Sequence, residues 1–101
     1  MAIMVLVTIP KKKAKSLTKI LLQNKACACV NILEEINSFF WWQGKVNNAK
    51  ESLLIIKTKS TGFEKLKILI KKHHPYDVPE IIAFKIDKMN KEYSQWLNKN
   101  V

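Results

Sequence analysis

The hydrophobic pattern is strongest over residues 38–58, which read SFFWWQGKVNNAKESLLIIKT. Four consecutive aromatic residues at 39–42 are followed by a polar middle and then by four aliphatic residues at 53–56. Aromatic and β-branched side chains favour strands, and the segment Asn47-Asn48-Ala49 suits a turn. We therefore predict one long β-hairpin. Because successive strand residues point to opposite faces, both faces of this hairpin are apolar and are expected to be buried.

Shorter apolar segments predict the other elements, since strands and helices differ in the spacing of their buried positions. In chain order these are a strand over 3–9, a helix over 12–25, a strand over 26–33, a helix over 63–74, a strand over 81–86 and a last helix with Met89, Tyr93, Trp96 and Leu97 on one stripe. Glu34-Glu35 is expected to form a bend or bulge before the hairpin, and Pro75 ends the second helix.

The order of these elements is βαββαβ with one extra helix at the end, which is the ferredoxin-like pattern. We predict an α+β fold in a single domain that spans residues 1–101. Two helices would cover one face of an antiparallel sheet and leave the other face lined by apolar side chains. Because an exposed apolar face of that size marks an association surface, we predict an oligomer whose sheets face one another.

Charge narrows the classes of partner. The formal net charge is +10, and all eighteen basic residues are lysine. The lack of arginine argues against specific nucleic-acid recognition, although non-specific attraction to polyanions is expected and the lysine content is also typical of a biased genome. No apolar run is long enough to span a bilayer, so we expect no membrane partner. The charges that follow the first apolar run reverse the order of a signal peptide, which favours a cytoplasmic protein.

Several short blocks together resemble the CutA divalent-cation tolerance family over nearly the whole chain. They are ACVNI at 28–32, WQGK at 42–45, IKT at 56–58, HPYDVPEI at 74–81 and YSQW at 93–96. The resemblance implies a homotrimer with an architecture similar to that of PII-type signalling proteins. It also implies a role in divalent metal ion (copper) tolerance or response, exerted through weak metal binding or through an unidentified protein partner. No catalysed reaction is established for the family.

The resemblance also directs attention to metal ligands. Proposals for the family combine a cysteine in the first strand with a histidine pair, but Val7-Thr8 here occupy the place of that cysteine. The candidate ligands for copper or another divalent cation are therefore His73, His74 and Cys29, since imidazole and thiolate suit copper. The alternative for His74 is to orient the turn that follows it. Cys27 and Cys29 are expected to share one strand face, as a chelate or, preferably, as core residues.

Charged and aromatic residues beside the strands are candidates to line a cleft between subunits. They are Lys45, Glu51, Lys57, Asp77, Glu80, Tyr76 and Trp96. An ion-pair network that fixes trimer register is the preferred interpretation, and a small anionic ligand held by Lys57, as in a PII-like regulator, is the alternative. A polyanion-binding module is a further alternative. We expect no enzyme, because the chain has no Ser/His/Asp spacing and no glycine-rich loop.

Overall fold

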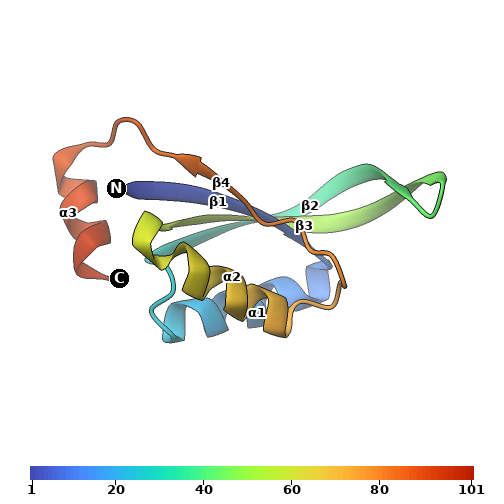
Figure 1. Ribbon diagram of the computed structural model, residues 1–101, viewed down its shortest axis with the longest axis horizontal. Helices are drawn as coiled ribbons and strands as arrows, with labels where there is room; N and C mark the ends of the chain where they lie inside the picture. The colour runs from blue at the N-terminus through green and yellow to red at the C-terminus, as the bar shows by residue number, and fades with distance from the viewer.

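A four-stranded antiparallel sheet in the order β2-β3-β1-β4 organises the protein, as seen in a computed structural model that describes all 101 residues (Figure 1). The elements are β1 (Ala2–Ile9), α1 (Lys11–Gln23), β2 (Cys29–Trp42), β3 (Lys45–Lys59), a short 3-10 helix η1 (Ser60–Gly62), α2 (Phe63–His73), β4 (Ile82–Lys85) and α3 (Lys91–Lys99). This order confirms the predicted α+β, ferredoxin-like arrangement with an extra C-terminal helix. The predicted bounds differ by one or two residues for most elements.

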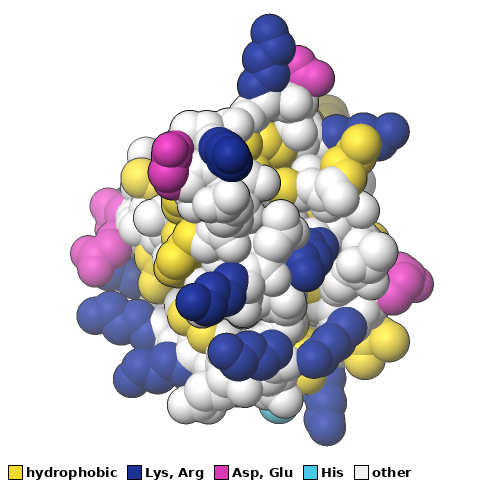
Figure 2. All heavy atoms as spheres, turned by 90° about the vertical axis from the view of Figure 1, so that its left-hand side faces the viewer, with side chains coloured by type: hydrophobic (Ala, Val, Ile, Leu, Met, Phe, Trp, Pro, Cys, Tyr) yellow, Lys and Arg dark blue, Asp and Glu magenta, His cyan; other side chains and the backbone are white.

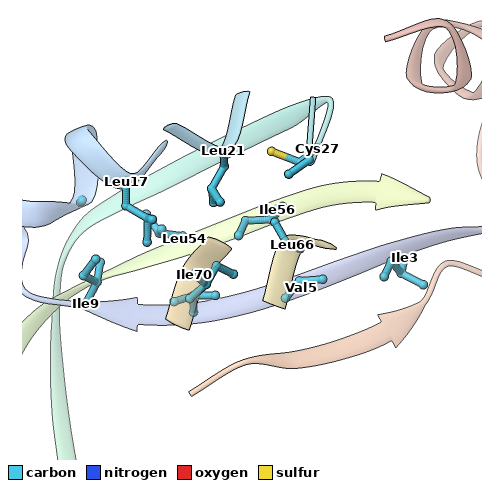
Figure 3. Packing of buried hydrophobic residues seen from close by; sticks show 13 residues of the cluster. Ile3, Val5, Ile9, Leu17, Leu21, Cys27, Leu54, Ile56, Leu66 and Ile70 are labelled. Carbon is cyan, nitrogen blue, oxygen red and sulfur yellow. The ribbon is translucent and has the colours of Figure 1, made fainter. Parts of the chain in front are cut away.

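Helices α1 and α2 lie together on one face of the sheet (Figure 1). Alternate residues of β1 from Ile3 to Ile9 point into the core between the layers, and Leu54 and Ile56 of β3 join them. Leu17 of α1 and Ile70 of α2 close the core from the helix side (Figure 3). Apolar residues that recur every three or four positions therefore predicted the helices correctly, because they form the buried stripe of each helix.

The predicted turn of the hairpin was wrong. The chain reverses at Gln43-Gly44, where both residues have positive φ values of 51° and 77°, and not at Asn47-Asn48-Ala49. Two positive φ values match the type I′ turn that suits the twist of a tight hairpin. The Asn47 side chain instead donates hydrogen bonds to the carbonyl oxygens of Trp42 and Lys45, at 3.1 and 3.2 Å. Asn47 thus supports the turn from within β3.

The strand predicted over 26–33 and the first arm of the hairpin form one continuous strand, β2. Its pairing with β3 shifts between Leu33 and Ile36, so the Glu34-Glu35 segment forms a bulge. The buried Ser52 hydroxyl donates to the Glu34 carbonyl oxygen at 2.7 Å. A bulge bends the strand and increases its twist. The hairpin consequently projects beyond the helices, and the longest dimension of the molecule reaches 45 Å (Figure 1).

The second face of the sheet carries apolar side chains that α1 and α2 do not cover (Figure 1). Strand pairing places Met4 and Leu6 of β1 beside Ile82 and Phe84 of β4 on this face. Leu53 and Ile55 of β3 extend the same face, and so does Leu33 of β2. The four aromatic residues 39–42 of the hairpin are also exposed, with 40% to 74% of each accessible to solvent. We refer to this face and the hairpin aromatics as the open apolar face.

Candidate functional site

A groove of about 1050 Å³ lies where the root of the hairpin meets the loop that follows α2. Its apolar wall comes from the hairpin aromatics, Ile36, Leu53 and Leu6. Its polar residues come mainly from β3 and from the loop at 75–80, which carries the HPYDVPEI block. Two segments far apart in the sequence therefore build the groove, and His74 and Tyr76 connect them.

His74 fastens the loop to the end of the central strand. Its Nε2 lies 2.8 Å from the Thr8 carbonyl oxygen, and its Nδ1 accepts a hydrogen bond from the Tyr76 backbone N–H at 3.1 Å. Because a carbonyl oxygen only accepts, Nε2 carries the proton and the imidazole is neutral. His74 is only 8% exposed, and its ring lies 4.8 Å from that of Tyr76. The histidine orients the turn, as the alternative interpretation of its role held.

Tyr76 reaches from this turn to a buried carboxylate. Its hydroxyl donates to Glu51 Oε2 at 2.7 Å, and Glu51 is only 4% exposed. Burial, followed by the hydrogen bond to Glu51, raises the pKa of Tyr76 to about 12. The structure thus brings together two of the predicted cleft residues. The contact stabilises Glu51, because a buried carboxylate needs a hydrogen-bond donor to replace the water that it loses.

The groove is acidic although the protein is strongly basic. Three of the eight carboxylates of the chain, on Glu51, Asp77 and Glu80, line it, and no lysine does. The lysines expected in a cleft lie elsewhere in the subunit: Lys45 is exposed at the hairpin turn, and Lys57 lies level with Met4 on β1. Within one subunit, a small anionic ligand in this groove would meet carboxylates of its own sign.

A second polar cluster lies at the opposite end of the sheet. Lys57 Nζ donates to Asn31 Oδ1 and lies 3.9 Å from Cys29 Sγ. Tyr93 of α3 approaches the same thiol, and burial together with Cys29 raises the pKa of that tyrosine. Trp96, the remaining cleft candidate, packs against Tyr93 with their ring centroids 5.4 Å apart. The predicted cleft residues are thus divided between the two ends of the sheet.

The two cysteines do not share a strand face, contrary to the prediction. Cys27 precedes β2, is 1% exposed and belongs to the core (Figure 3), whereas Cys29 pairs with Lys57 on the opposite face of the sheet. The alternation rule failed here because it holds only inside a strand, and β2 begins at Cys29. Burial, with a smaller contribution from Cys29, raises the pKa of Cys27 to about 12, so its thiol is protonated. Cys27 is a core residue.

The three candidate metal ligands do not converge within the subunit. His74 uses both ring nitrogens for backbone contacts beside Thr8, whereas Cys29 lies level with Met4, four residues and about 13 Å away along β1. His73 is exposed at the end of α2. No group of three or more His, Cys, Asp or Glu side chains is arranged to hold a metal ion. The residues of one subunit therefore do not fit a tight copper site.

Sequence reasoning missed the Thr8 carbonyl as the partner of His74 and the hairpin aromatics as groove residues. Neither carries a local signal, because the Thr8 contact joins residues 66 positions apart and the aromatic run reads simply as strand. The one available signal is the His-Pro-Tyr order itself. A proline that ends a helix holds a histidine and a tyrosine on either side of a fixed bend.

Comparison with known proteins finds close relatives. The family model described as CutA1 divalent ion tolerance protein matches residues 3–100. The divalent-cation tolerance protein CutA of Thermus thermophilus is 43% identical over 97 residues, which cover 95% of this chain and 94% of that protein. The chloroplastic Protein CutA 1 of Oryza sativa is 44% identical over 100 residues, which cover 98% of this chain but 56% of that longer protein. The solved structure of the periplasmic divalent cation tolerance protein CutA from Archaeoglobus fulgidus superposes with a TM-score of 0.96 at 38% identity, covering 99% of this chain and 98% of that one.

Proposed function

Because this chain belongs to the CutA1 divalent ion tolerance protein family, we propose that it acts in tolerance of divalent cations, copper included, as a homotrimer. The observation that supports the trimer is the open apolar face. Phe84, Leu33 and Trp41 on this face are each about half or more exposed, at 47%, 51% and 74%. A lone subunit would leave this apolar surface in water, and facing sheets would bury it.

The role that we propose is binding and not catalysis. His74 is the buried group best suited to acid–base chemistry, but backbone partners occupy both of its nitrogens. Metal binding would be weak, because His73 is the one imidazole with no hydrogen-bond partner and it stands apart from the cysteines. A protein partner that reads the state of the trimer would account for a response without a tight site.

Native mass spectrometry of metal-free protein, titrated with Cu(II) and then with Cu(I) under anaerobic conditions, tests this proposal. We expect a trimer that takes up copper only at a large excess of the metal. His73→Ala should lower this uptake, whereas Lys72→Ala, a matched change at the neighbouring exposed position, should not. His74→Ala should leave copper uptake unchanged. Stoichiometric copper that disappears in His74→Ala would contradict the proposed weak binding.

We place the protein in the cytoplasm. The support is its two free thiols, Cys27 and Cys29, since reducing compartments keep cysteines unpaired. No helix of the protein is long and apolar enough to cross a membrane. Relatives are described as periplasmic or chloroplastic, so the compartment varies among similar proteins. Fractionation of cells that express the chain at native levels tests this placement, and recovery in a periplasmic fraction would refute it.

A further inference from the structure

Half of the lysines lie on the two helices that cover the sheet. Nine of the eighteen belong to α1 and α2: Lys11, Lys12, Lys13, Lys15, Lys19, Lys65, Lys67, Lys71 and Lys72. The single acidic residue of these helices is Glu64, which pairs with Lys67 at 2.8 Å. The two helices therefore carry eight of the ten net positive charges. Figure 2 shows lysines gathered toward the lower side of the molecule, where α1 and α2 lie in Figure 1.

The lysines at the start of α1 destabilise their own helix. Lys11, Lys12 and Lys13 fill its first turn, which has no acidic residue, and its last turn has no basic one. The N-terminal end of a helix carries partial positive charge, so cations there are unfavourable. Helix α2 has the opposite, favourable order, with Glu64 in the first turn and basic residues in the last. A bound anionic surface would offset the repulsion at the start of α1.

Two exposed apolar side chains lie among these lysines. Ile68 of α2 is 62% exposed and lies two positions from each of the buried residues Leu66 and Ile70, which places it on the outer side of the helix. Lys65 and Lys72, three residues before it and four after it, lie on the same side. On α1, Leu22 is 36% exposed. We refer to the nine lysines with Ile68 and Leu22 as the lysine layer.

We propose that the lysine layer docks on an anionic phospholipid bilayer. Lysines beside exposed aliphatic side chains suit a lipid interface, where the ammonium groups meet lipid phosphates and the apolar side chains enter the acyl boundary. Nucleic acid fits less well, because the chain has no arginine for bidentate contacts and the layer has no exposed aromatic side chain for stacking.

Docking of the lysine layer on a bilayer is compatible with the lack of a membrane-spanning segment and with the expected trimer. The sequence predicts no membrane partner because no apolar run is long enough to span a bilayer. A peripheral contact needs no spanning segment. The layer also lies on the helix side of the sheet, away from the open apolar face, so a trimer with facing sheets leaves it uncovered (Figure 1). Lipid binding by the lysine layer is independent of the proposed role in cation tolerance, so either proposal can be refuted while the other is retained.

Co-sedimentation of the full chain with vesicles tests the proposal. Vesicles of equal parts phosphatidylcholine and phosphatidylglycerol should bind the protein at physiological salt, and vesicles of phosphatidylcholine alone should not. Each lysine near an anionic membrane raises the partition coefficient of the protein onto that membrane about fivefold. The triple variant Lys12→Gln, Lys15→Gln, Lys19→Gln should therefore lower binding roughly 100-fold. The variant Ile68→Ser, which keeps the charge, should lower binding several-fold.

A matched control removes the same charge outside the layer, from exposed positions in and before α3: Lys88→Gln, Lys91→Gln and Lys99→Gln. This control should retain most of the binding, and circular dichroism should show that every variant is folded. Equal loss in the control and in the α1 variant would overturn the proposal in favour of net charge alone. Binding to duplex DNA at physiological salt that exceeds binding to the vesicles, with no effect of Ile68→Ser, would overturn it in favour of nucleic acid.

Discussion

The hydrogen bond between Tyr76 and Glu51 should be a main support of the groove, and Tyr76→Phe removes only its hydroxyl donor. Glu51 is 4% exposed and Tyr76 donates to it at 2.7 Å. The substitution leaves a buried carboxylate oxygen without this partner. Hydrogen bonds to charged groups contribute about 1.5–3 kcal/mol, so we expect a loss of about 2 kcal/mol per subunit. The partial exposure of Tyr76, at 37%, keeps the expected value below the top of that range.

Urea unfolding followed by circular dichroism, at one fixed subunit concentration, measures this loss. Tyr93→Phe is the matched control, because its hydroxyl faces the Cys29 thiol, a weak acceptor, and its loss should cost less than about 1 kcal/mol. In a Glu51→Gln background the same Tyr76→Phe change should cost only about 1 kcal/mol, since the acceptor is then neutral. A Tyr76→Phe variant within about 0.5 kcal/mol of wild type, or an equal cost in both backgrounds, would refute the reasoning.

Three further outcomes follow from the fold. Gly44→Ala should destabilise the hairpin by about 1 kcal/mol in thermal unfolding, because the φ of Gly44 is 77°. Gly44→Asn should cost less, since asparagine tolerates that region, and equal costs would argue against the turn geometry. Leu54→Ala, at a fully buried core position, should cost about 3 kcal/mol in urea unfolding, against less than about 1 kcal/mol for the 36% exposed Leu22. The folded state binds the proton of Tyr76 more tightly than the unfolded state, because its pKa is raised from 10.0 to about 12. This contribution is complete below pH 10 and is lost as the pH rises to 12, so the difference in Tm between wild type and Tyr76→Phe should shrink over that interval, and a constant difference would contradict the assignment.

Much of the fold could be predicted because buried stripes repeat at fixed spacings. Leu17 and Leu21 mark α1, Leu66 and Ile70 mark α2, and the apolar run of β1 marks a central strand. The turn could not be placed in this way. Asparagines at 47 and 48 are typical turn residues, but the chain reverses four residues earlier, where Gly44 accepts a positive φ without strain. The backbone requirement of a two-residue turn outweighed residue preference.

The candidate site could be predicted only in part, since its contacts join distant segments. Glu51 and Tyr76 are both predicted cleft residues, yet nothing local indicates that Tyr76 donates to Glu51 across 25 residues. The histidine pair suggested a metal site because imidazole is a common ligand. The fold instead uses His74 to hold the loop to Thr8. A side chain's chemistry limits what it can do, but only the packing around it decides which partner it meets.

The measurement that tests the central claim most directly is native mass spectrometry of the metal-free protein at micromolar concentration, with Phe84→Lys alongside wild type. Phe84 is 47% exposed on the open apolar face, so a lysine there should be tolerated by the isolated subunit and should disrupt the association of facing sheets. We expect wild type at three times the 11.7 kDa mass of the chain and the variant largely as monomer. A wild-type protein found as a folded monomer would contradict the account, because its apolar sheet face would then be stable in water.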